Sequence, residues 1–405
     1  MATAAITSST TSPRLLDVAI RASLIGIVTS IATLGYIPAT QPHFYTLMLI
    51  SLAVYTMARG EELLDAVVQY VTSPAAAWRW AFVVWAIASL LWTSRGGFAV
   101  ERAITLVEIQ LVGLVFFDAA RNLGLTRWIL VTVLICVTVA AAYALLLGEP
   151  GVRSDRIAGG YRNPNTLAVV SVIALAIYCA GVNVVAGARR LMASFVVPLM
   201  LIGGIMASAS LKGLAGVACV GGLALFFRQT RCRVLALIAT LTGISVVLVT
   251  SFETLRLLWV HALQRVEISL TSLASSADIS MSLAERTRFI REGLRLIADA
   301  PFFGRGLDAF RWLSGEGTYA HNNFVDVGVS LGLVGVVLYY AIHVVLFAKA
   351  LRAGNRCSFV GRFILILIPT LMLLDMASVS YTAKLSSLLM LMSAGWLERT
   401  PEVTK

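Results

Sequence analysis

The feature that most constrains this chain is a series of long apolar runs that recur from one end to the other. Hydrophobic residues make up 59% of the 405 residues and charged residues 13%, whereas a soluble domain is about half apolar and about a quarter charged. A helix of about 20 apolar residues crosses the hydrocarbon core of a bilayer. Because the runs are continuous rather than alternating, helices are favoured over a β-barrel. The predicted fold class is all-α, a polytopic integral membrane protein.

We predict twelve transmembrane helices, although three of them are short and counts of ten or eleven stay open. Their centres are residues 22–38, 43–58, 77–94, 99–117, 126–147, 167–187, 191–208, 214–227, 234–251, 323–348, 363–380 and 385–397. The first run has no clear cleavage site after it and is interpreted as a retained span. This divides the chain into spans 1–9 with short loops (1–251), a large extramembrane segment (252–321), and spans 10–12 with a C-terminal tail (322–405).

The basic residues predict the orientation of the spans. Short, strongly basic loops at 187–190, 228–233 and 349–362 fall on one side of the membrane. The positive-inside rule therefore places both termini in the cytoplasm and the segment 252–321 outside. The net charge of +11 reports this topology and does not indicate a nucleic-acid partner. None of the five cysteines falls in an outer segment, so no disulfide framework is expected.

The large outer segment contains a basic helical stretch, "AERTRFIREGLRLIADAPFFGRG" (284–306). It has helical composition from Glu285 to Ala300 and ends at a proline. Arg288, Arg291 and Arg295 recur at helical spacing and form one stripe. This pattern predicts an amphipathic helix near the membrane whose arginines are available to an anion. The alternative is a solvated face whose arginines pair with neighbouring acids.

A second outer loop, "RIAGGYRNPNTLA" (156–168), is basic on the side where the positive-inside rule disfavours basic residues. Arginine suits bidentate capture of phosphate, so Arg156 and Arg162 indicate a phosphate-binding role. The alternative is only a loop followed by a helix cap, because Asn165 with Thr166 can cap the next span.

One of the chain's four histidines, His321, stands at the start of a predicted span in "AHNNFVDVG" (320–328). A helix N-terminus disfavours an additional positive charge, so the imidazole should stay neutral and available as a base. The alternative is that His321 faces water or caps the helix together with Asn322 and Asn323.

Several motifs are absent from the sequence. It has no G-x-x-x-x-G-K-[ST] phosphate loop, no H-E-x-x-H, no G-x-S-x-G and no Asp-x-Asp pair. A reaction on a phosphorylated substrate outside the membrane would therefore use arginine in place of a metal ion, without ATP. No metal and no cofactor is expected.

Together, 288–310, 320–335 and 156–168 resemble the O-antigen ligase and O-antigen polymerase superfamily of bacterial inner-membrane glycosyltransferases. The shared pattern is an arginine-led helix, then Pro and Gly-x-Gly, then His-Asn opening a span with Gly-x-x-Gly. This chain has Ser330 where the family often carries Glu, and Lys212 where the family tends to have Ser-Arg. The resemblance implies a fold like that of other GT-C membrane glycosyltransferases.

The resemblance also implies substrates and roles. The donor would be a polysaccharide on undecaprenyl diphosphate at the periplasmic face of the inner membrane, and the acceptor lipid A–core. His321 would be the base and Arg288 would stabilise the departing diphosphate, with inversion at the anomeric carbon. The residues expected to bind the diphosphate are Arg156, Arg162, Asn163, Asn165, Lys212, Arg265, Arg291 and Asn322. An O-antigen polymerase, a transferase to protein, a transporter of lipid-linked glycans and a structural partner in an envelope assembly stay open as alternatives.

Overall fold

A computed structural model of the chain describes residues 13–33, 41–93, 96–148, 150–151, 154–157, 161, 163–181, 189–227 and 281–399. Within these ranges the regular secondary structure is helical apart from one short antiparallel hairpin, β1 (Pro150–Gly151) with β2 (Ser154–Ile157). The helices are α1 (Pro13–Ala32), α2 (Gln41–Arg59), α3 (Glu62–Thr72), α4 (Pro74–Ala88), the 3-10 turn η3 (Ser89–Leu91), α5 (Gly96–Arg121), α6 (Thr126–Leu147), α7 (Pro164–Ala180), α8 (Arg189–Ala207), α9 (Leu211–Phe226), α12 (Met281–Asp299), α13 (Ala309–Leu313), α14 (Asn323–Leu351), α15 (Ala353–Arg356), α16 (Phe359–Asp375) and α17 (Lys384–Leu397).

The helical character predicted from the apolar runs is confirmed. A helix occupies eleven of the twelve predicted spans, and the ninth, 234–251, lies outside the described residues. Five helical segments in the described part are long and apolar enough to cross a membrane: Arg14–Ala32, Pro74–Leu91, α5, α6 and α14. The chain is therefore described as a polytopic helical membrane protein, and the count of twelve crossings stays a prediction. The short helix α3 was not predicted, because its first turn carries Glu62 and Asp65.

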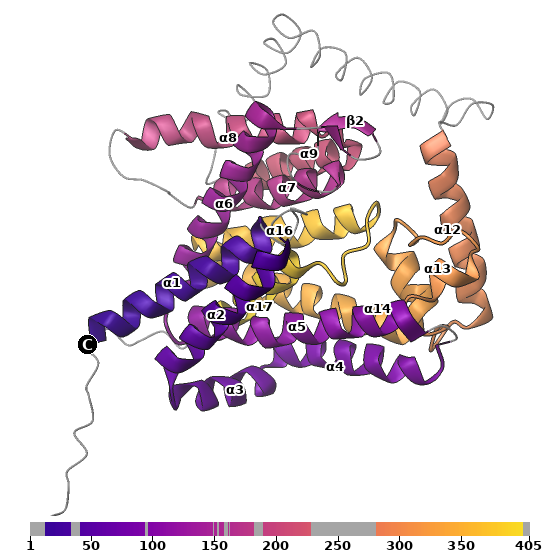
Figure 1. The fold of residues 1–405 in the computed structure, drawn as a ribbon, viewed down its shortest axis with the longest axis horizontal. Coiled ribbons are helices and arrows are strands. Elements are labelled where there is room, and N and C mark those ends of the chain that lie inside the picture. Colours follow the sequence, from indigo (N-terminus) through magenta and orange to yellow (C-terminus); the bar gives the residue numbers. More distant parts are fainter. Residues whose placement is uncertain are drawn as a thin grey trace, which may run out of the picture.

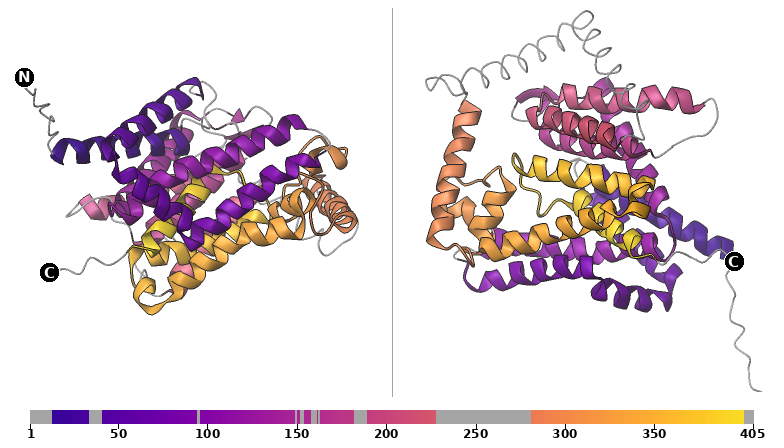
Figure 2. Two further views of the ribbon diagram at one scale, coloured as in Figure 1. Left: turned by 90° about the horizontal axis from the view of Figure 1, so that it is seen from below. Right: turned by 180° about the vertical axis from the view of Figure 1, so that it is seen from behind.

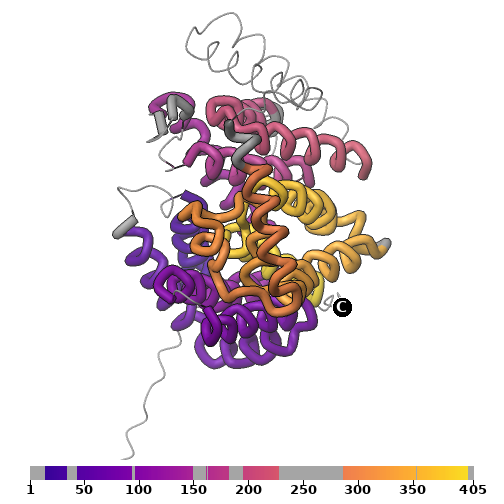
Figure 3. The backbone as a smooth tube through the Cα atoms, turned by 90° about the vertical axis from the view of Figure 1, so that its right-hand side faces the viewer, coloured from indigo at the N-terminus to yellow at the C-terminus, as the bar shows by residue number. Residues whose placement is uncertain are grey.

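The long helices run side by side, and one helix lies across their ends. In Figure 1, α4, α5 and α14 lie together, α6 to α9 form a second group, and α16 and α17 lie between the two. Figure 2 shows the same arrangement from two other sides. Helix α12 stands across the end of the bundle opposite the start of α1, and Figure 3 views the molecule from this end. We call this end of the bundle the α12 end. The helix predicted from Glu285 to Ala300 is thus confirmed as α12.

Helix α14 is interrupted at Gly332, whose backbone has φ 67° and ψ −169°. Only glycine adopts this conformation readily, and a Cβ here would also collide with the carbonyl of Phe302. The loop 301–306 supplies the hydrogen bonds that the helix loses at the break. The amides of Arg305 and Gly306 donate to the carbonyls of Val329 and Ser330, and the amides of Leu333 and Val334 donate to those of Pro301 and Phe302, at 2.8–3.2 Å. The break therefore leaves these backbone groups paired, as a low-dielectric environment requires.

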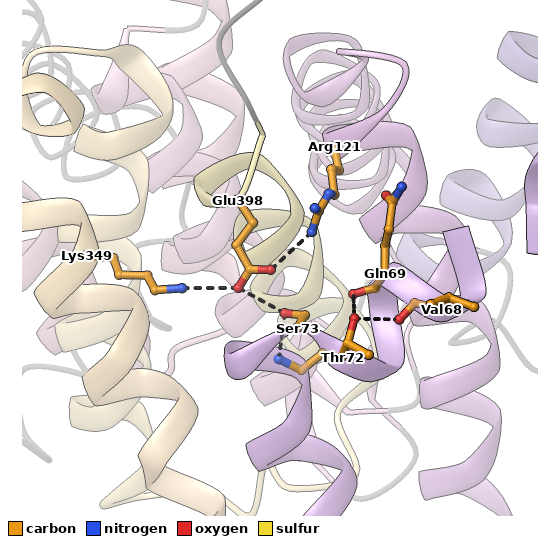
Figure 4. A network of polar contacts seen from close by, with 8 residues as sticks. Val68, Gln69, Thr72, Ser73, Arg121, Lys349 and Glu398 are labelled. Atoms are coloured by element: carbon orange, nitrogen blue, oxygen red, sulfur yellow. Dashed lines mark hydrogen bonds and ion pairs between the residues drawn. The ribbon is translucent and has the colours of Figure 1, made fainter. Parts of the chain in front are cut away.

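At the opposite end of the bundle, one carboxylate joins four helices (Figure 4). Glu398, directly after α17, accepts hydrogen bonds from Ser73 at 3.0 Å, Lys349 at 3.1 Å and Arg121 at 3.4 Å. Ser73 is also the N-cap of α4, because its hydroxyl accepts from the amide of Ala76 at 3.2 Å. The ends of α4, α5, α14 and α17 are tied together by this cluster.

Candidate functional site

A cavity of about 370 Å³ lies among helix starts toward the α12 end. Helices α2, α7, α9 and α17 all begin beside it, and the segment before α14 lines it as well. Each helix N-terminus carries a partial positive charge, so their convergence favours an anion. The polar side chains that line the cavity are Tyr45, Asn163, Asn165, Thr166, Lys212, Arg286, Tyr319, His321, Asp375, Ser378, Ser380, Thr382, Lys384 and Ser386.

His321 lies in this cavity with a constrained geometry. Its backbone is left-handed, with φ 54°, a conformation that costs a residue with a Cβ roughly 1 kcal/mol or more. The imidazole lies 4.3 Å from the ring of Tyr319 and, nearly parallel to it, 5.9 Å from the ring of Phe289, measured between centroids. Asn322 follows as the N-cap of α14, its side-chain oxygen accepting from the amide of Val325 at 3.1 Å.

The surroundings of His321 keep its imidazole neutral. Burial, followed by the positive charges of Arg286 and Lys212, lowers the pKa of His321 to about 4. Among the described residues no hydrogen bond reaches the ring, and the hydroxyl of Ser330 is buried and likewise unpaired within the described part. His321 can therefore accept a proton at neutral pH, and its orientation comes from the flanking rings and the backbone.

Arg286 is one of the cavity residues that the sequence interpretation missed. It shares the inward face of α12 with Phe289 and Gly293, both buried. A Cβ at Gly293 would overlap the side chain of Val325, so α12 crosses α14 at very close range there. This contact places Arg286 and His321 in one cavity. The sequence signal that could have identified Arg286 is its position as a charged residue on the apolar face of an amphipathic helix.

The predicted arginine stripe faces away from the cavity. Arg288 is exposed and pairs with Glu316 at 2.7 Å, and Arg295 is exposed and pairs with Glu292 at 2.6 Å. Arg291 is exposed as well. This arrangement resembles the alternative of a solvated face whose arginines pair with acids, and none of the three arginines lines the cavity. The assignment of Arg288 and Arg291 to the diphosphate stays a prediction.

Three of the predicted polar residues do line the cavity: Asn163, Asn165 and Lys212. Asn163 caps α7, its side chain accepting from the amide of Asn165 at 2.9 Å. The side-chain oxygen of Asn165 accepts from the hydroxyl of Ser210, the N-cap of α9, at 2.9 Å. These bonds fix the starts of α7 and α9 against each other, next to Lys212.

The remaining predicted residues are Asn322, Arg156, Arg162 and Arg265. Asn322 does not line the cavity, and its amide nitrogen donates to the carbonyl of Met376 at 3.2 Å. Arg162, Arg265 and the side chain of Arg156 lie outside the described residues. Of the predicted outer segment 252–321, the structure describes 281–321.

Asn323, one residue further on, fixes the segment 376–383 beside His321. Its side-chain oxygen accepts from the amides of Ser380 and Tyr381 at 2.9 and 3.1 Å. Its nitrogen donates to Tyr340 at 3.0 Å and to Asp375 at 3.3 Å. Asn323 is fully buried, so it joins α14, α16 and this segment by a satisfied network.

The cavity combines the groups that a group transfer from a phosphorylated donor needs. A neutral imidazole can take a proton from a nucleophile. Two of its cations, Arg286 and Lys212, together with two amide side chains and several helix starts, can stabilise an anionic leaving group without a metal ion. Tyr319 and the hydroxyl side chains offer partners for sugar hydroxyls.

Part of the chain is similar to a known protein family. The family model described as O-antigen ligase matches residues 195–340, a region that contains Lys212, Arg286 and His321. A search of curated proteins finds no match. The family match agrees with the resemblance of the chain to the O-antigen ligase and polymerase superfamily.

Proposed function

We propose that the protein transfers an O-antigen polysaccharide from undecaprenyl diphosphate to lipid A–core, at the periplasmic face of the bacterial inner membrane. Both termini are proposed to lie in the cytoplasm. The observation that carries the proposal is the meeting of His321, Arg286 and Lys212 in one cavity, because the transfer needs a base and an anion site side by side.

In the proposed reaction, a hydroxyl of the acceptor attacks the anomeric carbon of the donor sugar. His321 takes the hydroxyl proton as the new C–O bond forms. The bond between the anomeric carbon and the diphosphate oxygen breaks, and undecaprenyl diphosphate leaves with the bonding electron pair. Arg286 and Lys212 stabilise the charge that gathers on this leaving group. A single displacement of this kind inverts the anomeric centre, and it consumes neither ATP nor a metal ion.

The test is transfer by the purified full chain, supplied with donor and lipid A–core in detergent with a chelator. The wild type should form ligated lipopolysaccharide. His321→Ala should lower the rate by about 10²–10⁴-fold, the usual contribution of a general base. Ligation by folded His321→Ala at the wild-type rate would sink the base assignment.

A paired substitution separates the two arginine assignments. Arg286→Met removes a cation from the cavity, and Arg288→Met removes the same charge two residues further along α12, on the exposed face. Because only Arg286 lines the cavity, we expect it to give the larger loss of rate. A larger loss for Arg288→Met would return the diphosphate role to the outer stripe.

The same assay distinguishes the related activities. A polymerase would lengthen glycan on the lipid carrier when supplied with the donor alone, whereas the proposed ligase needs lipid A–core. Product that appears only on the carrier would replace the ligase proposal with the polymerase.

A further inference from the structure

Three cations line the cavity among the described residues: Lys212, Arg286 and Lys384. The proposed mechanism uses only the first two. These two are also the cations whose charges lower the pKa of His321. The third cation that lines the cavity is Lys384, at the start of α17.

Lys384 has an unusual setting for a residue in a membrane helix bundle. Its ammonium pairs at 2.7 Å with Glu108, in the middle of α5, and both side chains stay partly exposed, at 23% and 29%. The ammonium also lies 5.0 Å from the ring centre of Phe44 and 5.7 Å from that of Tyr45, both of which line the cavity. Charged pairs inside a bilayer are costly and mark functional sites.

The wall around Lys384 differs in chemistry from the wall around Lys212 and Arg286. The segment 378–386 contributes hydroxyl groups to the cavity, and its one cation is Lys384. The hydroxyl-bearing residues are Ser378, Ser380, Thr382 and Ser386. Hydroxyl groups beside aromatic rings suit a sugar, whereas two cations beside helix starts suit a diphosphate.

Buried groups hold this wall in place from three helices. Asn323 of α14 fixes the amides of Ser380 and Tyr381. Arg79 of α4, itself buried, donates to the carbonyl of Tyr381 at 3.0 Å. Arg102 of α5 lies 5.3 Å from the ring centre of Tyr381. A wall fixed in this way is preorganised for binding.

We propose that segment 378–386 is the acceptor subsite, and that the ammonium of Lys384 binds a phosphate on the acceptor glycolipid. The inference rests on the proposed function. In a displacement at the anomeric carbon, nucleophile and leaving group approach and depart on opposite sides, so acceptor and diphosphate need separate subsites. Glu108 neutralises Lys384 in the empty cavity and competes with the acceptor phosphate for it.

The experiment measures equilibrium binding of lipid A–core, and of lipid A–core treated with phosphatase, to the purified full chain in detergent without donor. The wild type should bind the phosphorylated form about tenfold more tightly, the effect of roughly one charge-assisted hydrogen bond. Lys384→Met should remove this preference and leave the dephosphorylated acceptor bound as in the wild type. Glu108→Gln should strengthen binding of the phosphorylated form, because it releases Lys384 from its carboxylate.

Arg295→Met is the matched control, since it removes one positive charge from the exposed face of α12. It should leave the preference for the phosphorylated acceptor unchanged. Equal affinity of the wild type for both acceptors would overturn the inference, and this comparison does not depend on any variant folding. A Lys384→Met variant that instead weakens binding of the donor, titrated in the same way without acceptor, would assign Lys384 to the diphosphate. Binding as expected without any transfer would overturn the proposed function alone.

Discussion

At the scale of the residue, His321 shows how the cavity prepares a base. The rings of Phe289 and Tyr319 and a left-handed backbone hold it, and burial with the charges of two cations keeps it neutral. The same cations that lower its proton affinity would hold the leaving group. Binding of an anionic donor therefore changes the base as well, because it offsets the charges of Arg286 and Lys212.

This coupling predicts how the transfer rate depends on pH. A base must be unprotonated, so the rate falls as pH drops through its pKa. For kcat/KM, which reports the free enzyme, the acid limb should lie near pH 4, as the pKa of His321 indicates. For kcat, which reports the complex, the limb should lie higher, because the bound diphosphate offsets the two cations.

Lys212→Met provides the check on the charge of the free enzyme. This substitution should move the acid limb of the kcat/KM profile to higher pH. The limb should stay below the ordinary histidine pKa of about 6.5, because burial is the larger cause of the lowered pKa. Rate profiles between pH 3.5 and about 8 measure both limbs. Coincident limbs in the wild type, near pH 6.5, would contradict the assignment of His321 as a base beside these cations.

The sequence pattern located part of this site. His321, Lys212, Asn163 and Asn165 stand at the starts of alternate apolar runs in the predicted series, and alternate antiparallel spans begin at the same end of a bundle. Arg286 was not predicted as a site residue, because helical periodicity draws attention to the polar stripe of the helix. A polar stripe faces solvent, whereas Arg286 lies on the opposite, inward face. Asn323 was interpreted only as a cap, since its four partners lie far away in sequence.

At the scale of the element, the joint between α14 and the loop 301–306 governs the site. The part of α14 before Gly332 carries the network of Asn323 and follows directly on His321. The loop 301–306 follows α12, which carries Arg286. Backbone hydrogen bonds between the loop and the broken helix therefore set the position of the base relative to the cation.

Gly332→Ala should damage this joint severely. The residue would face a positive φ together with a collision against the carbonyl of Phe302, and we expect a loss of about 3 kcal/mol in stability. Thermal unfolding in detergent and the transfer assay measure the effect. Gly222→Ala in α9 is the control, because nothing lies within 4 Å of its added Cβ; it should keep the melting temperature. Equal melting temperatures for the two variants would argue against a strained joint.

The apolar pattern predicts that a helix follows His321, but it does not predict the break. Glycine is frequent in transmembrane helices, so the run "VSLGLVG" looks like an ordinary span. The positive φ arises from the loop that docks there, a tertiary contact with no periodic signal. Helix α12, in contrast, was predicted closely, because its amphipathic pattern and its terminal proline are local features.

At the scale of the whole molecule, the cavity and the cluster of Glu398 occupy different ends of the bundle. The positive-inside rule predicts that the Glu398 end faces the cytoplasm and the α12 end the periplasm. Cys357 is exposed in the loop between α15 and α16, and Arg295 is exposed on α12. These two positions allow a direct measurement.

In intact cells, a maleimide that cannot cross the inner membrane should label Arg295→Cys and should leave Cys357 unmodified. Disruption of the membrane should then expose Cys357 to the reagent. Mass spectrometry of the purified chain reports both sites. Labelling of Cys357 in intact cells, with protection of position 295, would reverse the proposed orientation.

The hydrogen bonds of Asn323 and Arg79 join residues that are far apart in the sequence, and this has a consequence for biosynthesis. Asn323 binds amides 57 and 58 residues later in the chain, and Arg79 binds a carbonyl 302 residues later. A chain emerging from the ribosome thus contains His321, Arg286 and Lys212 before the wall 378–386 has been synthesised. The cavity closes only after α17 has been inserted, so an unfinished chain in the membrane has no complete site at which to consume lipid-linked glycan.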